Sequence, residues 1–368
     1  MAALTLLATP PAAHAQESAP ESALKVSGFL SIIGGRVFGT NTDRYEGPAT
    51  IDGNDCPCYI ADWGNAGIYN EKFSLEPESR AGIQFKYTVN PQLNAVAQIV
   101  VRGTDTRPRV QWAYVSYAPT RQVEFQLGRK RIPLYFYSDF QDIGVSYPWA
   151  GVPPELYGWE ATNYNGASAR YKTSFGDTGV NASVFAGRET VKDSLYQQLY
   201  YDDRTRVTWD NIGGGDVEFS RGPLTVRGVY MQATVLTTNP GAGLDDRAKL
   251  KAYGMAANLE LDEWFVLSEV TQLTRDFDGY RVTAPALTVG AGYRYGSWTP
   301  FINYARYKER TDEPELYAPQ SFSRSSVTLR YDLDARSALK GQVDRQKDLT
   351  RNFGGDSTVL RIAYDRLF

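Results

Sequence analysis

Residues 81–102 read AGIQFKYTVNPQLNAVAQIVVR, and this stretch decides the fold. Apolar side chains occupy every second position of 81–89 and again of 93–101, with polar side chains between most of them. A period of two predicts a β-strand that has one apolar face and one polar face. Asn90-Pro91 interrupts the pattern with residues that favour turns. We interpret the stretch as two antiparallel strands joined by a tight turn.

The same alternation recurs along the chain as far as its last residues. In each run the residues at every second position are apolar, and the residues between them are polar or small. We call each of these two alternating sets of positions a parity. Clear examples lie at 167–175, 287–295 and 360–365. No stretch reaches the roughly 20 consecutive apolar residues that a membrane helix requires. The sequence therefore predicts an all-β protein.

Short turns and longer polar loops alternate between these runs. The short turns are Asn90-Pro91, Pro119-Thr120, Gly176-Asp177-Thr178, Arg221-Gly222-Pro223, Asp262-Glu263, Gly296-Ser297 and Leu333-Asp334-Ala335. The longer connections are 40–79, 133–165, 190–212, 237–248, 277–285, 311–322 and 348–355, with one short exception at 104–108. About sixteen strands result, and this pattern is typical of an antiparallel transmembrane β-barrel with short periplasmic turns and long extracellular loops.

A soluble β-sandwich or propeller is the alternative, because its strands also alternate. The polar parity of the predicted strands, however, carries too many charges to be packed into a dry core without partners. A soluble fold also leaves the alternation of turns and loops unexplained. The charged residues of the polar parity are Lys86, Arg102, Arg170, Lys172, Arg227, Arg294, Arg330, Lys340 and Arg361.

The N-terminus carries the features of an export signal. An apolar run at 2–8 is followed by Pro10-Pro11 and by Ala13-His14-Ala15, which is a site of the A-x-A type. We expect residues 1–15 to be a cleaved signal peptide, although a basic n-region is missing and an Ala-rich terminus without a sorting role is the alternative. Residues 16–23 then form a short periplasmic lead-in, and 24–368 form a single barrel domain in the bacterial outer membrane.

Composition excludes two classes of function. The 368 residues carry a net charge of -3, which argues against a nucleic-acid-binding protein. The one histidine, His14, lies in the predicted signal, so the mature chain has no imidazole for catalysis or for a zinc site. We therefore expect no enzyme, no cofactor and no nucleic-acid partner. The 25 tyrosines against 16 phenylalanines suit a boundary between water and an apolar phase.

The chain ends LRIAYDRLF at 360–368, an amphipathic strand that closes on Phe368. This end resembles the last strand of Gram-negative outer-membrane proteins, although Arg366 departs from the usual aromatic or apolar residue. Over 24–368 the chain resembles the Gram-negative porin family. The resemblance implies sixteen strands around a water-filled pore, a homotrimer, and a loop after the fifth strand that folds into the pore. Loop 104–108 is shorter than the loop with which that family latches its subunits.

The fifth strand is expected at about 121–132, so the constriction loop corresponds to 133–165. Its carboxylates are then expected inside the pore, facing basic residues of the wall and forming a transverse field. Arg129 and Arg131 stay ambiguous, because strict alternation turns them outward and a bulge at Gly128 reverses this. The predicted constriction comprises Asp139, Asp142, Glu155 and Glu160 of the loop and Lys86, Arg102, Lys130, Arg170 and Arg36 of the wall.

The function that follows is passive diffusion of ions and small hydrophilic solutes. A substrate-specific channel for a sugar or an organic anion is the alternative, and a structural or receptor barrel would need a plug or exterior domain. The preference for anions or cations stays open. A sugar-specific channel would line its path with aromatic rings. The rings of the loop could do this, or they could anchor the loop against the wall. They are Tyr135, Tyr137, Tyr147, Trp149 and Tyr157.

Two further features concern the loops. Cys56 and Cys58 flank Pro57 in the first long loop, where oxidation to a structural disulfide is the favoured interpretation. A metal site at this point would need more ligands than the nearby aspartates supply. The pairs Asp202-Asp203 and Asp245-Asp246 are loop charges that can bridge divalent cations to lipopolysaccharide, which with outer-membrane lipid is an expected partner.

Overall fold

The computed structural model describes residues 23–41 and 45–368. The predicted signal peptide and all but the last residue of the predicted lead-in lie outside the described residues. None of the helices in these two ranges is long and apolar enough to cross a membrane.

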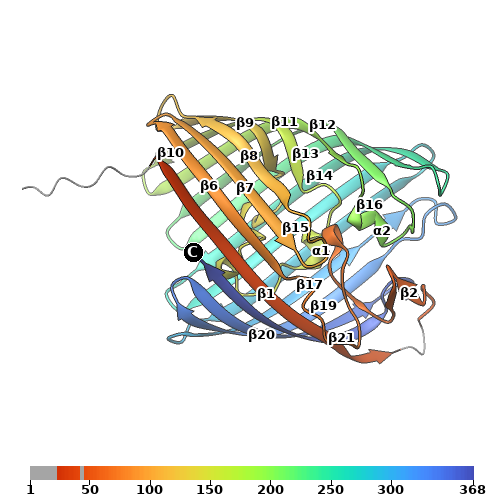
Figure 1. The fold of residues 1–368 in the computed structure, drawn as a ribbon. Coiled ribbons are helices and arrows are strands. Elements are labelled where there is room, and N and C mark those ends of the chain that lie inside the picture. The colour runs from red at the N-terminus through yellow and green to blue at the C-terminus, as the bar shows by residue number, and fades with distance from the viewer. Residues whose placement is uncertain (1–22, 42–44) are drawn as a thin grey trace, which may run out of the picture.

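The chain forms a closed antiparallel ring of strands (Figure 1). Closure occurs at β1, which pairs with β21 on one side and with β6 on the other. The ring strands are β1 (Leu24–Asn41), β6 (Arg80–Asn90), β7 (Leu93–Arg102), β8 (Arg109–Tyr117), β9 (Val123–Arg131), β10 (Asn163–Phe175), β11 (Thr178–Val191), β12 (Arg206–Arg221), β13 (Leu224–Asn239), β14 (Leu244–Glu260), β15 (Trp264–Asp276), β16 (Arg281–Tyr293), β17 (Trp298–Lys308), β19 (Ser321–Asp334), β20 (Ser337–Asp348) and β21 (Asp356–Leu367).

The ring has sixteen positions, because β18 (Arg310–Thr311) continues β17 after a break at Glu309 and pairs with the same neighbour, β16. This confirms the predicted antiparallel barrel of about sixteen strands. β9 is the fifth strand of the ring, close to the predicted bounds of 121–132.

Seven connections of two to five residues lie at one end of the ring, and eight connections, six of them longer, lie at the other (Figure 1). Two loops predicted to be long, 237–248 and 277–285, are short hairpins at 240–243 and 277–280. The reason for the first is visible at the start of β14, where Asp245 and Arg247 are exposed on the outward parity and precede buried Ala248. These polar outward positions make a regular strand resemble a loop in the sequence.

The outward face of the barrel is apolar, as the alternation predicts. Leu127, Met255 and Ile302 are each more than 60% exposed although they belong to regular strands. Aromatic pairs Trp264–Tyr293 and Trp298–Tyr331 lie at the short-turn end. An apolar band with an aromatic edge is the surface that a membrane-spanning barrel presents to lipid.

The inward face is less uniform than the sequence predicts. On β19–β21 it carries buried charged side chains such as Arg324, Lys340 and Arg361. On β1 it is mostly apolar, with buried Phe29, Ile33 and Val37. On β12–β16 the prediction of a polar or small inner face is wrong. The loop-end half of that wall carries buried apolar side chains that pack against a chain segment inside the ring: Val207, Trp209, Met231, Val235, Leu250 and Leu273.

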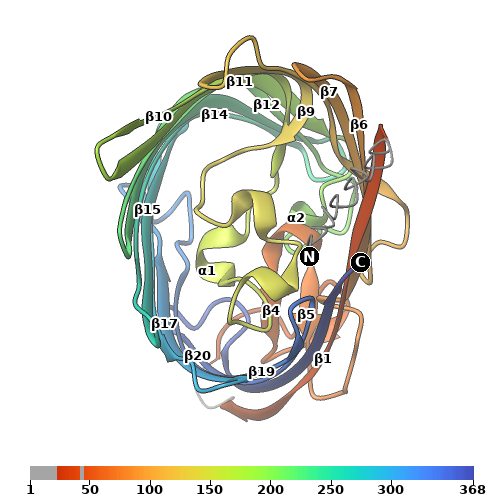
Figure 2. The same cartoon turned by 90° about the vertical axis from the view of Figure 1, so that its left-hand side faces the viewer.

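Two connections fold into the ring (Figure 2). The first long connection, 45–79 as described, contains β2 (Thr50–Ile51), β3 (Asn54–Asp55), β4 (Tyr59–Asp62), η1 (Trp63–Asn65) and β5 (Gly67–Tyr69). The second is 132–162, between β9 and β10, with η2 (Ser138–Phe140), η3 (Gly144–Ser146) and α1 (Pro154–Tyr157). We call 132–162 the inner segment. One further helix, α2 (Leu195–Gln198), lies in the loop between β11 and β12.

Candidate functional site

The inner segment starts where β9 loses its regular alternation. Gly128 has φ +136°, a value that side-chain-bearing residues rarely adopt. Beyond it, Arg131 is 3% exposed and reaches the inner segment, whereas Arg129 donates to Glu189 of β11 and to the Val110 carbonyl. The distortion thus separates the two arginines that the sequence left ambiguous.

Asp142 is the first anchor of the inner segment. Its carboxylate accepts from Arg131 Nη2 at 2.5 Å and from Arg102 Nη2 at 2.7 Å, and Arg80 Nε donates to its carbonyl at 2.9 Å. Burial alone would raise the pKa of the Asp142 carboxyl, but Arg102, Arg131 and Arg80 outweigh burial and hold that pKa well below its usual range. Asp142 is therefore a fixed anion bound to three strands of the wall.

A second group of contacts binds the inner segment to β19 and β20. Lys340 Nζ donates to the carbonyls of Gly144 and Trp149 at 2.6 and 2.7 Å. Arg330 Nη1 donates to the carbonyls of Val145 and Tyr147. These contacts give the backbone carbonyls in and around η3 partners on the barrel wall.

Glu155, at the start of α1, is the third anchor. Arg324 Nε and Nη2 donate to its two carboxylate oxygens at 2.9 and 3.0 Å, a bidentate geometry. Arg324 is completely buried and also donates to Asp344 of β20 at 2.8 Å. On β15, three positions from β19 in the ring, Glu269 accepts from the Tyr157 hydroxyl at 2.7 Å and from Phe136 N at 2.9 Å.

The first long connection reaches the same network. Arg361 of β21 donates to Glu78 at 2.8 Å and to Asp344 Oδ2 at 2.9 Å, and its guanidinium lies over the Tyr59 ring. Cys56 and Cys58 form a disulfide in this connection, with Cα atoms 4.3 Å apart. Both inward connections are thus bound to the wall formed by β19–β21.

A polar cavity of about 180 Å³ lies on the other side of the inner segment, against β9–β13. Its strand wall supplies Lys130, Arg170 and Lys172, and the inner segment supplies Asp139. Arg170 lies 3.9 Å from Glu124, and no ion pair among the described residues involves Asp139. Asp216 and Glu218 of β12 line the same cavity, with Asp216 bound to Arg227 at 3.2 Å.

The predicted site residues thus separate into groups. Arg102 and Asp142 form an ion pair, while Lys130, Arg170 and Asp139 meet in the cavity. Glu155 lies apart from them, against Arg324.

Three other residues lie away from both groups. Glu160 is half-buried and accepts from Trp209 Nε1 at 3.4 Å. Lys86 is exposed on β6, near the short-turn end, and no contact among the described residues joins it to the inner segment. The placement of Arg36 on the inner wall is wrong: it is exposed and shares the outward parity of Ile32 and Phe38, because β1 alternates without interruption up to Val37.

The rings of the inner segment are mostly anchors. Tyr147 and Trp149 are each 1% exposed, and the Trp149 ring contacts Phe301 edge-on. Tyr135 and Tyr157 pack together with ring centroids 4.6 Å apart. Tyr137 is half-buried beside them. These rings do not form an exposed track for a solute.

Sequence reasoning missed the main partners of the inner segment. Arg80, Arg324, Glu78 and Asp344 were not singled out, although each is charged and the last three join into one network. Arg80 and Arg324 occupy polar-parity positions of their strands, and this was the signal that could have placed them on the inner face. Their partners lie far away in the sequence, 62 residues for Arg80 and Asp142 and 169 for Arg324 and Glu155.

Comparisons with known proteins agree with this architecture. The family model for Gram-negative porins matches residues 2–351. The fold is similar to the outer membrane channel DcaP of Acinetobacter baumannii (TM-score 0.63, 11% identity, 94% of this chain and 97% of that chain). It is also similar to an anion-selective porin from Comamonas acidovorans (TM-score 0.59, 16% identity, 95% and 100%) and to the trimer form of OmpT, an outer membrane protein of Vibrio cholerae (TM-score 0.57, 12% identity, 94% and 99%). No curated protein matches the sequence. The chain belongs to the Gram-negative porin family and is an outer-membrane channel for the passive diffusion of solutes.

Proposed function

We propose that ions and small hydrophilic solutes cross the barrel between the inner segment and the wall formed by β9–β13. The observation that supports this path is the unequal use of charge on the two sides of the segment. On the β19–β21 side the basic side chains are paired with carboxylates of β20, β21 and the inner segment and with backbone carbonyls of the inner segment. On the β9–β13 side Lys130 and Arg170 face Asp139 across a cavity.

The narrowest section is then set by Lys130, Arg170 and Asp139. Arg102, Asp142 and Glu155 hold the inner segment in place instead of facing the solute. Basic side chains on β9 and β10 opposite acidic side chains on the segment and on β12 give a transverse field, which reorients polar solutes and favours neither ion sign strongly. Lys86, nearer the short-turn mouth, adds positive charge to the approach from the periplasm.

The path is tested by reversal potentials of single channels in planar bilayers under a salt gradient. Neutralising Lys130 and Arg170 together removes positive charge from the proposed narrow section, and neutralising Arg345 and Lys347 removes the same charge from the outward face of β20. We expect a shift toward cations for the first pair only. Equal behaviour of the two pairs contradicts the proposed path.

A channel specific for an organic anion is the second candidate function. Lys130, Arg170 and Lys172 form a basic strip on adjacent strands, and such a strip can bind carboxylate groups. A sugar-specific track finds no comparable support, because the rings of the inner segment are buried. Concentration-dependent block of conductance by one organic anion, with no block by chloride or sugars, distinguishes the specific channel from the general one.

Assembly and partners complete the proposal. A homotrimer fits the trimer form known for one similar structure and the small residues Ala81 and Ala95 on the outward parity of β6 and β7. Residues 1–15 are proposed as the cleaved signal. Outer-membrane lipid and lipopolysaccharide are the proposed surroundings, with Asp202-Asp203 and Asp245-Asp246 as sites for bridging cations.

A further inference from the structure

On β14–β18 the outward side chains change from apolar and aromatic at the short-turn end to basic toward the loop end. On β17 the outward residues run from Trp298 at the short-turn end through Ile302 and Tyr304 to Arg306. Eight residues at about 3.3 Å each, tilted by about 40°, put Arg306 about 20 Å above Trp298 along the membrane normal. Arg306 therefore lies near the outer edge of the apolar band.

Three basic side chains gather at this edge, Arg306, Lys308 and Arg310. None of the ion pairs or side-chain hydrogen bonds among residues 23–41 and 45–368 involves any of them. Two other exposed arginines differ, because Arg281 is bound to Asp276 and Arg129 to Glu189. Arg345 on the outward face of β20 also has no ion pair among the described residues, so the unpaired state alone does not distinguish this edge. A cation at the edge of the apolar band is attracted by anionic groups of the lipid.

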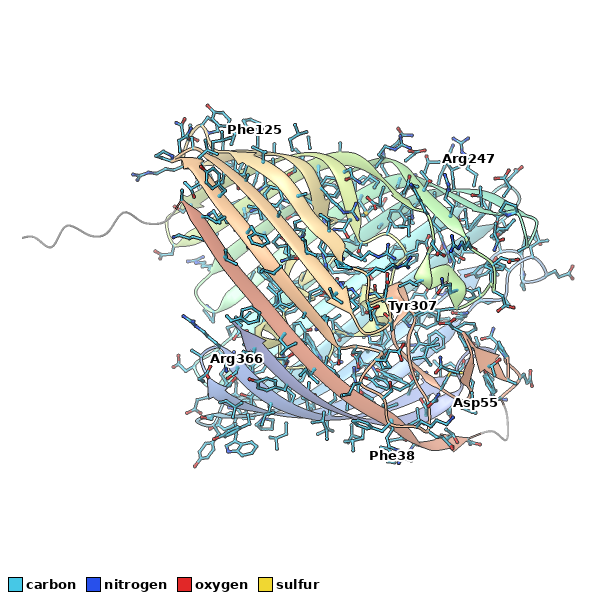
Figure 3. The ribbon with its side chains drawn as sticks, viewed as in Figure 1. Phe38, Asp55, Phe125, Arg247, Tyr307 and Arg366 are labelled. Atoms are coloured by element: carbon cyan, nitrogen blue, oxygen red, sulfur yellow. A yellow bond between two sulfur atoms is a disulfide. The ribbon has the colours of Figure 1, made fainter. Side chains whose placement is uncertain are left out.

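The three cations border a groove of about 590 Å³ on the outside of the barrel. The floor of the groove is mostly apolar and is formed by Tyr253 and Met255 of β14, Val270 of β15 and Leu287 of β16. Leu287 is opposite Arg306 in the register of β16 and β17, so the apolar floor and the basic rim are adjacent. On the loop-end side, Lys249 and Lys251 of β14 continue the exposed basic edge. Arg247, on the same parity, lies at the loop-bearing end of the barrel, opposite the end that carries Phe125 and Arg366 (Figure 3).

We propose that this groove binds one phosphorylated lipid of the outer leaflet, with an acyl chain on the apolar floor and a phosphate group on Arg306, Lys308 and Arg310. The inference goes beyond the proposed passage of solutes and uses only the outward face. Arginine suits a phosphate because its guanidinium donates two parallel hydrogen bonds to the oxygens. The apolar floor distinguishes a lipid from a free phosphate ion, which has no part that can occupy it.

The test is native mass spectrometry of the whole protein, folded in detergent, with hexa-acylated bisphosphorylated lipid A as the probe. The wild type is expected to retain one lipid, and Arg306→Gln with Arg310→Gln to lower its affinity about 30-fold, since each cation near an anionic headgroup contributes a factor of about five. Val270→Trp, which fills the groove without changing charge, is expected to lower lipid affinity as well. Arg345→Gln with Lys347→Gln removes the same charge from β20, away from the groove, and is expected to leave lipid affinity unchanged.

Circular dichroism confirms that each variant is folded, and channel conductance, which concerns the lumen, is expected to stay at the wild-type value. Unchanged lipid affinity in the Arg306 and Arg310 variant overturns the proposal, and so does an equal loss in the β20 control. Full displacement of the lipid by millimolar inorganic phosphate also overturns it, because it shows a phosphate site without a lipid site. A smaller oligomer at unchanged lipid occupancy would assign the groove to contact between barrels.

Discussion

Arg361 Nε donates to the carboxylate of Asp344 at 2.9 Å, and both side chains are completely buried in the barrel wall. The second oxygen of Asp344 accepts from Arg324 at 2.8 Å. Arg361 also forms an ion pair with Glu78 of the first connection, and Arg324 forms one with Glu155 of the inner segment. One carboxylate of β20 therefore joins the anchors of both connections that fold into the lumen.

Asp344→Asn is predicted to loosen both inward connections at once. The change leaves two buried guanidinium groups short of negative charge, and breaking a buried ion pair in this way costs about 3–5 kcal/mol. We expect a lower free energy of unfolding in denaturant and more frequent, larger conductance steps. Asp278→Asn, in an exposed hairpin, is the matched control. Identical traces for the two variants would show that the network does not hold the inward connections.

Asp142→Asn is predicted to free the start of the inner segment, leaving the rest bound through Glu155 and the carbonyls held by Lys340. The pKa of Asp142 is lowered in the folded protein, so its stabilisation is fully present above the unfolded value of about 3.9 and is lost as pH falls below that value. Fluctuations of the single-channel current in the wild type should therefore be constant from pH 8 to about pH 5, because Asp142 stays ionised over that range. The variant should show larger fluctuations at every pH. Noise in the wild type that rises between pH 8 and pH 6 would contradict this role of Asp142.

Glu160→Gln is predicted to stabilise the protein at neutral pH. Burial raises the pKa of the Glu160 carboxyl, with Arg275 and Trp209 opposing the shift. A raised acid pKa means that the ionised form is disfavoured by folding, so the wild type loses stability as pH rises through that range. Glutamine keeps an oxygen for Trp209 and carries no charge. Unfolding in denaturant should show the gain at pH 7 and none near pH 4, and the reverse order would refute the assignment.

Asp139→Asn is predicted to shift the reversal potential toward anions, because it removes negative charge from the proposed narrow section. The double change Lys130→Gln and Arg170→Gln is predicted to shift it toward cations. Opposite signs from opposite sides of the cavity are the signature of a transverse field. Shifts of the same sign, or none in 0.1 M salt, would place the narrow section elsewhere.

The fold was accessible from the sequence because alternation and loop length are local properties. The same parity argument placed Arg102, Lys130 and Arg170 on the lumen side. It failed for the inner face of β12–β16, where Trp209, Met231 and Leu250 face the lumen because the inner segment covers them. Only the folded chain brings such a segment to that wall.

The site was only partly accessible for the same reason. Glu155 was predicted to lie in the lumen without its partner Arg324, which is 169 residues away. Asp142 and Glu155 were predicted to face the solute, yet each is buried against arginines of the wall. A charge count cannot distinguish a carboxylate that lines a pore from one that anchors a loop, because the difference lies in how many cations surround it.

The central claim is that solutes pass between the inner segment and β9–β13. Ser168 of β10 lines that cavity, and Ser325 of β19 is exposed on the outward face. The most direct measurement is single-channel conductance of Ser168→Cys before and after reaction with a bulky thiol reagent, with Ser325→Cys as the control and labelling verified by mass. The account predicts a large loss of conductance for the Ser168 variant and none for the Ser325 variant. Unchanged conductance after complete labelling at position 168 would contradict it.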